Sequence, residues 1–307
     1  MTPSNPVSEA LRKFSIWCES DSLPPYLAAA VEDAGFWRLW LGGPPASLAN
    51  VEQILSQTST LQVASGIVNI WSADARTVAA SYRRLEDRYP GRFLLGIGAG
   101  HPEAAAEYTK PYEAISRYLD VLDAEGVPLE GRVLGSLGPR ILKLAADRSA
   151  GAHPYLVPPA HTAQARAIVG PGKLLVPEHK VVLDADPDRA RKIGRARVQN
   201  PYLGLVNYTT NLRRLGFTHD DLAGAGSDRL VDAVVAQGSA AAVAARLGEH
   251  LDAGADEVAV QLLTPDPNDD VRPYLIELAA ALQRYEAAHW GRYPEYQVRP
   301  IGRDRGR

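Results

Sequence analysis

The stretch LQVASGIVNIWSADARTVAASYRRLEDRYPGRFLLGIGAG, residues 61–100, decides the fold of this 307-residue chain. It begins with an apolar run that is typical of a buried strand. Asp74 then stands where a helix N-cap is expected, ahead of a helical pattern that reaches Gly91. A second apolar run starts at Arg92. A strand, a helix and a strand in this order predict two parallel strands joined by a crossover helix.

The same alternation extends in both directions along the chain. It predicts eight strands, the last ending near Gln261 and the first seven at residues 13–20, 37–43, 61–72, 92–100, 131–138, 152–157 and 173–183. A long region after the seventh strand, from Pro187, is expected to be helical. Eight such units favour a closed (β/α)8 TIM barrel over an open sheet. We expect residues 1–285 to form one barrel domain and residues 286–307 to be a poorly ordered tail.

Composition limits the class of protein further. The residues are 46% hydrophobic, so a large core is possible, and the net charge of −3 provides no basic field for nucleic acid. Cys18 is the only cysteine, which excludes an internal disulfide and fits a reducing cytosol. No run approaches the roughly 20 apolar residues that cross a bilayer, and the N-terminus lacks the blocks of a signal peptide. We therefore expect a cytoplasmic protein without a membrane or nucleic-acid partner.

Several familiar catalytic motifs do not occur in the sequence. The glycines of GIGAGHP, residues 96–102, stand at its first, third and fifth positions, whereas a dinucleotide loop needs the first, third and sixth. The seven histidines include no HExxH pair and there are no cysteine pairs, so no metal site is expected. GSLG, residues 135–138, is not GxSxG, and Cys18 has no identifiable catalytic partner. Rossmann-type, metal-dependent and acyl-transfer chemistry are therefore disfavoured.

A TIM barrel carries its chemistry at the carboxyl ends of its strands, so those ends supply the candidate residues. In the third strand, Gly66 indicates a bulge, a close approach by another group, or simply room for packing. Asn69 offers a donor and an acceptor to a flat heterocycle, or else caps the strand end. The fourth strand ends in Gly98, Ala99 and His101. His101 is expected at the rim of the barrel mouth, where it either contacts the substrate or has a purely structural role at the end of the strand.

The fifth strand ends in a possible anion site. Its end consists of Ser136, Leu137, Gly138 and Pro139. Proline stands at the first helical position, and the free N–H groups and positive end of that helix suit a phosphate. Helices also begin in this way without binding any ligand.

The sixth and seventh strands carry further polar residues. His153 and Tyr155 lie near the end of the sixth strand. Glu178 and His179 are neighbours in the seventh, and because side chains alternate along a strand, one of them enters the barrel. That residue serves either as a hydrogen-bonding core group or as part of a site. The other histidines are expected at the surface: His161, His219, His250 and His289.

Three stretches, residues 64–103, 131–178 and 238–263, resemble the luciferase-like family of flavin- and F420-dependent oxidoreductases. The resemblance extends from about Phe14 to Tyr285, and it is closest to a branch that is assigned coenzyme F420. It implies a (β/α)8 barrel, usually a homodimer, with the cofactor at the C-terminal mouth.

The resemblance also implies three groups of cofactor contacts. A bulge in the third strand, often with a cis non-prolyl peptide, backs the deazaflavin ring at Ser65, Gly66 and Ile67. The cofactor phosphate rests on the loop and helix start at Ser136, Leu137, Gly138 and Pro139. The end of the fourth strand lies beside the reacting carbon, at Gly98, Ala99 and His101.

One position departs from the family pattern. F420-dependent sugar-phosphate and alcohol dehydrogenases carry an Asp-His pair after the second strand, where this chain has Gly42 and Gly43. Since the usual base is missing, oxidation of an alcohol is not expected. The resemblance then implies a reductase that uses reduced F420 on a C=C, C=N or C=O bond of a small molecule or secondary metabolite. His101, His153 and Tyr155 are the candidate proton donors.

Two alternatives remain open. The first is an FMN-dependent monooxygenase, which the same fold permits. The second is a cofactor-binding barrel without catalysis, which the missing Asp-His pair motivates.

Overall fold

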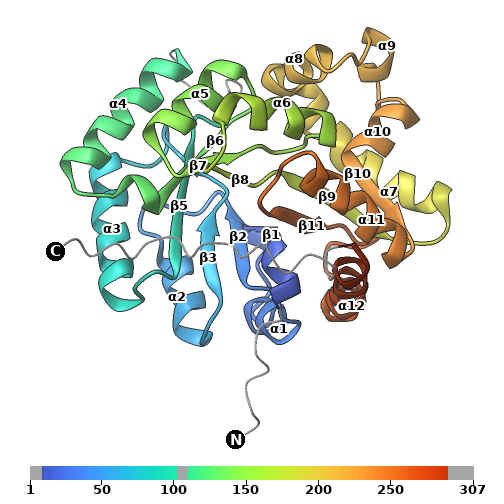
Figure 1. Cartoon of the computed structure of the whole chain (residues 1–307), viewed down its shortest axis with the longest axis horizontal. Helices are drawn as coiled ribbons and strands as arrows, with labels where there is room; N and C mark the ends of the chain where they lie inside the picture. The colour runs from blue at the N-terminus through green and yellow to red at the C-terminus, as the bar shows by residue number, and fades with distance from the viewer. Residues whose placement is uncertain (1–8, 102–109, 290–307) are drawn as a thin grey trace, which may run out of the picture.

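The computed structural model describes residues 9–101 and 110–289, in which parallel strands are surrounded by helices (Figure 1). The strands are β1 Phe14–Glu19, β2 Arg38–Gly42, β3 Gln62–Ser65, β4 Val68–Asn69, β5 Phe93–Gly98, β6 Arg132–Gly135, β7 Gly151–His153, β8 Leu174–Leu175, β9 Glu178–Leu183, β10 Val235–Gly238 and β11 Val258–Leu262. The α-helices are α1 Leu27–Asp33, α2 Ala49–Gln57, α3 Ala75–Arg88, α4 Pro111–Ala124, α5 Pro139–Arg148, α6 Pro159–Val169, α7 Pro187–Gln199, α8 Val206–Arg214, α9 His219–Leu222, α10 Asp228–Val234, α11 Ala240–Asp252 and α12 Arg272–His289.

The strands pair in the order β10-β9-β11-β1-β2-β3-β5-β6-β7-β8. The segment that carries β8 and β9 bridges β7 and β11. On one side, the amide of Val176 donates to the carbonyl of Ala152 in β7; on the other, the amide of Ala259 in β11 donates to the carbonyl of Pro177. The sheet therefore curls into a barrel, and the predicted TIM-barrel fold is confirmed.

The third predicted strand is interrupted at its expected bulge. β3 ends at Ser65, the Gly66–Ile67 peptide is cis, and β4 begins at Val68. The hydroxyl of Ser65 donates to the carbonyl of Gly96 and accepts from the amide of the same residue, both at 2.8 Å. Its side chain thus replaces ladder hydrogen bonds between β3 and β5 where the bulge removes them.

Two predictions about the later strands need correction. The seventh predicted strand is divided into β8 and β9, with Pro177, which has no N–H to donate, in the gap between them. β10 was not predicted, because this region was expected to be helical. Its four residues follow α10 without a turn, so their apolar character continues the pattern of that helix.

The helices begin and end for identifiable local reasons. Asp74 caps α3 as predicted, since its carboxylate accepts from the amide of Thr77 at 2.9 Å. α12 continues to His289, four residues beyond the predicted end of the barrel domain, and Glu286 within it is buried. The predicted disorder of the tail beyond His289 lies outside the described residues.

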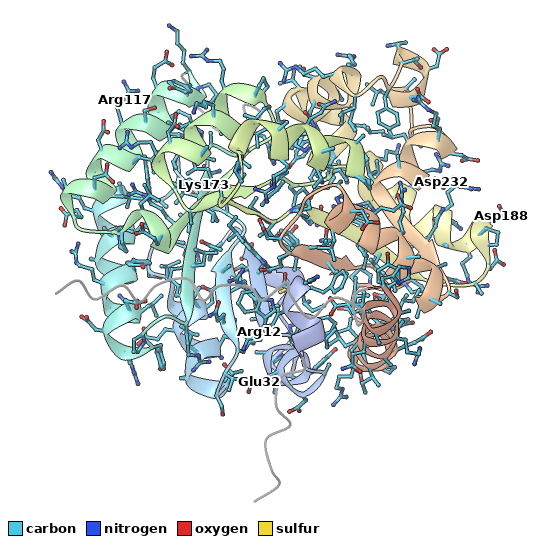
Figure 2. All side chains as sticks on the ribbon, viewed as in Figure 1. Arg12, Glu32, Arg117, Lys173, Asp188 and Asp232 are labelled. Carbon is cyan, nitrogen blue, oxygen red and sulfur yellow. The ribbon has the colours of Figure 1, made fainter. Side chains whose placement is uncertain are left out.

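Charged side chains extend from the outer helices, as Arg117 and Asp188 do in Figure 2. Among the residues that the structure describes, no helix combines the length and the apolar character required to cross a membrane.

Two histidines expected at the surface are buried instead. His250 lies within hydrogen-bonding distance of His179, at 2.9 Å, and of Thr162, at 2.8 Å. His161 donates from Nε2 to the carbonyl of Leu137 at 2.9 Å. The sequence could not reveal these partners, because they come from different elements of the fold. His219 and His289 are exposed, as predicted.

Candidate active site

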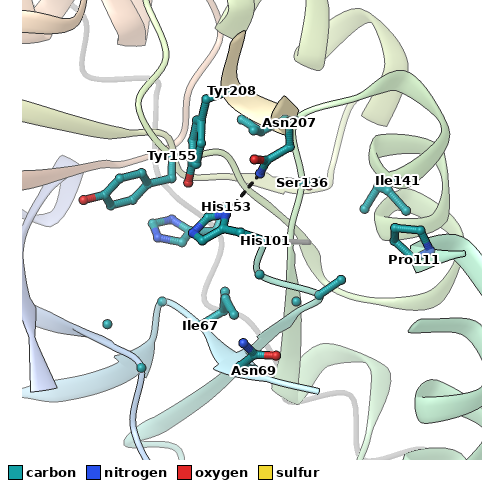
Figure 3. A pocket seen from close by; sticks show the side chains of 18 of the residues that line it. Ile67, Asn69, His101, Pro111, Ser136, Ile141, His153, Tyr155, Asn207 and Tyr208 are labelled. Carbon is teal, nitrogen blue, oxygen red and sulfur yellow. Dashed lines mark hydrogen bonds between the residues drawn. The ribbon is translucent and has the colours of Figure 1, made fainter. Parts of the chain in front are cut away.

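A cavity of about 380 Å³ opens at the carboxyl ends of the strands and brings most of the predicted site residues together (Figure 3). Those that line it are Gly66, Ile67, Asn69, Gly98, Ala99, His101, Ser136, Leu137, Gly138, His153 and Tyr155. Ser65 and Pro139 do not line the cavity. Ser65 is completely buried in its contact with β5, and Pro139 forms the first turn of α5.

Ile67 forms part of the cavity wall because two glycines make room for it. A Cβ atom at Gly98 would lie 3.1 Å from Cγ1 of Ile67, and one at Gly135 would lie 3.0 Å from its Cγ2. The glycine at 96 has a related role, since a Cβ there would lie 1.9 Å from the carbonyl oxygen of Ser65. These glycines accommodate the bulge between β3 and β4, and the bulge then presents Ile67 to the cavity.

Asn69 both caps its strand and faces the cavity. Its Oδ1 accepts from the amide of Trp71 at 3.0 Å, while its Nδ2 has no hydrogen-bond partner among the described residues. Gly100 has a φ of +58°, and a Cβ there would lie 2.8 Å from that Nδ2 atom. The side chain of Asn69 therefore keeps N–H donors for a ligand.

His101 lies at the cavity rim against α8. The Nδ2 atom of Asn207 is 3.3 Å from Nδ1 of His101, and the ring of Tyr208 lies 5.4 Å from the imidazole ring (Figure 3). An amide nitrogen can only donate, so Nδ1 accepts and the proton of the neutral imidazole is on Nε2. His101 thus retains the protonated nitrogen that a proton donor requires.

His153 is held in the opposite tautomer. Its Nδ1 lies 2.7 Å from the carbonyl oxygen of Val176, which can only accept, so the proton is on Nδ1. Burial lowers the pKa of His153 to about 4, and its ring stacks on Trp40 at 4.1 Å. The unprotonated Nε2 has no partner and lies 2.9 Å from the position of a Cβ at Gly66. In this form Nε2 can accept a hydrogen bond and has no proton to donate.

Tyr155 presents its ring to the cavity and uses its hydroxyl elsewhere. The hydroxyl donates to Oε1 of Gln261 at 2.9 Å and accepts from Tyr202, in the short helix Tyr202–Gly204, at 2.7 Å. Nζ of Lys180 lies 4.1 Å from the ring centre of Tyr155 and 3.0 Å from Oε1 of Glu178. Glu178 is thus the inward-facing residue of the predicted pair, and it belongs to this buried network.

Several other residues that line the cavity were not among the predicted site residues. They are Trp17, Glu19, Gly42, Gly43, Gly100, Pro111, Ile115, Gly135, Ile141, Asn207 and Tyr208. Tyr208 comes from α8, and its hydroxyl points toward His153 with no hydrogen-bond partner among the described residues (Figure 3). Burial raises the pKa of this phenol well above its usual value, so it stays protonated.

The space after β2 is filled by β1. A Cβ at Gly42 would lie 2.5 Å from Cζ2 of Trp17 and 2.7 Å from Oε2 of Glu19. The other carboxylate oxygen, Oε1, accepts from Arg197 in α7 at 2.6 Å. The absence of a side chain at residue 42 therefore places an indole and a paired carboxylate at the cavity wall.

The start of α5 has the features expected of an anion site. Gly138 is its N-cap and offers no side chain, and the hydroxyl of Ser136 donates to the carbonyl of Leu134. The amides of Leu137, Gly138 and Arg140 have no hydrogen-bond partner among the described residues. Nη1 of Arg214 in α8 lies 3.3 Å from the position of a Cβ at Gly138. Uncapped amides beside a guanidinium suit a phosphate group.

Within residues 9–101 and 110–289, no three His, Cys, Asp or Glu side chains are grouped as a metal ion would require. The polar groups at the cavity wall comprise two imidazoles, two phenols, a serine hydroxyl, amides and one paired carboxylate.

The fold agrees with the family to which the chain belongs. Residues 26–257 match the family model described as luciferase-like monooxygenase, so the chain belongs to that family. A search of curated proteins found no match.

Three solved structures illustrate the range of the fold. An F420-dependent secondary alcohol dehydrogenase in complex with an F420-acetone adduct is 14% identical, with 88% of this chain and 98% of that chain covered and a TM-score of 0.67. The coenzyme F420-dependent tetrahydromethanopterin reductase from Methanopyrus kandleri is 18% identical, with coverages of 87% and 97% and a TM-score of 0.64. The oxygenating constituent of 3,6-diketocamphane monooxygenase from Pseudomonas putida, in complex with FMN, is 13% identical, with coverages of 88% and 96% and a TM-score of 0.65.

Proposed function

We propose that the protein is an F420-dependent oxidoreductase that acts as an F420H2-dependent reductase of a C=C, C=N or C=O bond. The observation that carries the proposal is the combination, in one cavity, of an apolar surface at Ile67 with the uncapped start of α5. A planar ring bearing a phosphorylated side chain matches this combination. The names of two structures with the same fold, which specify F420, support the choice of a deazaflavin.

The residues present fit such a cofactor. Ile67 would support the ring, Asn69 would donate from Nδ2 to a ring heteroatom, and the α5 amides with Arg214 would hold the phosphate. When bound, reduced F420 supplies the hydride; the protein supplies position and electrostatics.

The chain must also deliver a proton. His101 carries its proton on Nε2, and Tyr208 keeps a protonated hydroxyl directed into the cavity. His153 accepts through Nε2, and the hydroxyl of Tyr155 is occupied by Gln261 and Tyr202. We therefore retain His101 as a candidate donor, add Tyr208, and assign His153 and Tyr155 to positioning.

An FMN-dependent monooxygenase is the second candidate function. One structure with this fold contains FMN, and FMN also combines a planar ring with a phosphate. A non-catalytic cofactor-binding barrel is the third, and turnover of any reducible compound with reduced F420 would exclude it.

Titration of the purified protein with F420 and with FMN, followed by fluorescence quenching, tests the choice of cofactor. We expect saturable quenching with F420 and at least tenfold weaker binding of FMN, roughly the 1.4 kcal/mol that one specific contact supplies. Binding of FMN without binding of F420 would reject the deazaflavin and favour the monooxygenase.

From the resemblance alone, we further propose a cytoplasmic homodimer that acts on a small molecule or secondary metabolite. Sedimentation velocity tests the dimer directly, because the chain has a mass of 33.1 kDa and a dimer has twice that mass.

A further inference from the structure

A second cavity adjoins the first and contains none of the residues assigned above to the cofactor. It has a volume of about 490 Å³ and lies between the ends of β1 and β11 and helix α7. The two cavities share Trp17 and Glu19 as a common wall. The indole of Trp17 donates to the carbonyl of Gly66 at 3.3 Å, which ties this wall to the bulge beneath the first cavity.

Gln261 brings a buried donor to the second cavity. Its side chain is 6% exposed, and its Oε1 accepts from the hydroxyl of Tyr155. Because Tyr202 donates to Tyr155, the hydroxyl of Tyr155 must direct its own proton to Gln261. The Nε2 atom of Gln261 has no hydrogen-bond partner among the described residues. Because Gln261 lines the cavity, this N–H group is available to a ligand oxygen.

Arg197 contributes further donors to the same cavity. Its Nη2 donates to Oε1 of Glu19, and no other hydrogen bond of its guanidinium occurs among the described residues. The carboxylate of Glu19 balances its charge, and Asp269 adds a negative charge to the cavity wall. A second carboxylate would be repelled there, so these donors suit a neutral oxygen acceptor, such as a carbonyl.

Apolar side chains make up much of the remaining wall. They are Leu27, Ile193, Ala196, Leu262, Leu263 and Val271. A ligand for this cavity therefore has a largely apolar body in addition to its oxygen acceptor.

We propose that the second cavity anchors the substrate, a neutral, largely apolar enone whose C=C bond reaches past Trp17 into the first cavity, where the hydride and the proton are supplied. Its carbonyl oxygen accepts from Nε2 of Gln261 and from the guanidinium of Arg197. The assignment as substrate rests on the proposed function, because it takes the first cavity as the cofactor site. It selects the C=C bond of a conjugated enone from the wider range of bonds considered above.

Saturation-transfer difference NMR with 2-cyclohexen-1-one as the probe tests this site without requiring turnover. We expect saturable binding to the protein, and weaker or no binding of cyclohexanecarboxylate. Ala196→Trp places an indole in the cavity from an exposed position of α7 and should abolish binding of the enone. Lys192→Phe adds an aromatic ring on the same helix outside the cavity lining and should leave binding unchanged.

Gln261→Leu tests the hydrogen bond itself. It should weaken enone binding about fivefold, as expected for one neutral hydrogen bond. Enone binding that is unaffected by both Ala196→Trp and Gln261→Leu would overturn the proposal, as would tighter binding of the carboxylate or no saturable binding of the enone.

A parallel F420 titration separates this proposal from the proposed function. Loss of enone binding in Ala196→Trp with unchanged F420 affinity supports both. Loss of enone binding in that variant, when the wild-type protein does not bind F420, would support the second cavity as a carbonyl site and reject the F420 function.

Discussion

The two sides of the barrel mouth are built by different means. On the side of β3, β5 and β6, glycines and a backbone bulge determine the shape, and the main feature presented to the cavity is Ile67. On the side of β7, β9, α7 and α8, aromatic and charged side chains determine it, with Tyr155, Tyr202 and Lys180 in one buried network. The backbone side suits the fixed ring of a cofactor, whereas the side-chain side can vary with the substrate.

The largest expected effect is on the backbone side. Gly96→Ala would place a Cβ 1.9 Å from a carbonyl oxygen of β3, and neither strand can move without disturbing the barrel. We expect a loss of about 3 kcal/mol in the free energy of unfolding, measured by urea denaturation. Gly204→Ala, where a Cβ meets nothing within 4 Å, should change it by less than about 0.5 kcal/mol. Equal effects of the two substitutions would contradict this account of the bulge.

The next effect concerns His153, which lies where the two sides meet. Its pKa in the folded protein is about 4, whereas the unfolded chain binds the same proton near pH 6.5. The unfolded state therefore binds more protons between these values, and the protein loses stability as the pH falls from 6.5 to 4. At pH 5 this one residue should cost about 2 kcal/mol relative to pH 8.

Urea denaturation of His153→Asn across this pH range measures that contribution. Asparagine can donate to Val176 and cannot titrate, so the acid-induced loss of stability should shrink by about 2 kcal/mol. The exposed His219→Asn should leave the pH dependence unchanged. An unaltered pH dependence in the His153 variant would mean that the folded protein holds this histidine with an ordinary pKa.

Arg214 tests whether the backbone side also binds phosphate. Arg214→Gln should weaken binding of F420 about tenfold, the effect of losing one charge-assisted hydrogen bond at a partly hydrated site. Binding of the phosphate-free deazaflavin fragment should be unchanged, and Arg213→Gln, one residue earlier in α8, serves as the matched control. A similar loss for both ligands would assign Arg214 to the ring or to stability rather than to phosphate.

The smallest effect is expected on the side-chain side. Tyr202→Phe removes the hydroxyl that donates to Tyr155, which should lower the free energy of unfolding by about 1 kcal/mol. Affinity for F420 should not change, because Tyr202 does not line the first cavity. A large fall in F420 affinity would show that the two sides are not separable.

The sequence revealed the backbone side more readily than the side-chain side, for physical reasons. A glycine inside an apolar strand is a local signal, so Gly66 and the glycines that follow β5 could be recognised without the fold. Tyr208 and Arg214 reach the mouth only because α8 packs over it, and nothing local in their helix indicates this position. The eight barrel strands followed from periodicity, whereas four-residue β10 was too short to interrupt a helical pattern.

The sequence also could not predict which ring nitrogen of each histidine carries the proton. His101 and His153 both stand near strand ends and were assigned the same role as proton donors. Their difference depends on single partners, Asn207 for one and the carbonyl of Val176 for the other, which only the folded chain supplies. The burial of His161 and His250 has the same explanation, because their partners come from other elements.

A crystal structure of the protein with F420 tests the central claim most directly. The account predicts that the deazaflavin ring lies against Ile67 and that the phosphate contacts the amides at the start of α5 beside Arg214. It also predicts that the second cavity, next to Gln261 and Arg197, stays open to a substrate. A cofactor ring bound in the second cavity, or a phosphate bound away from α5, would contradict it.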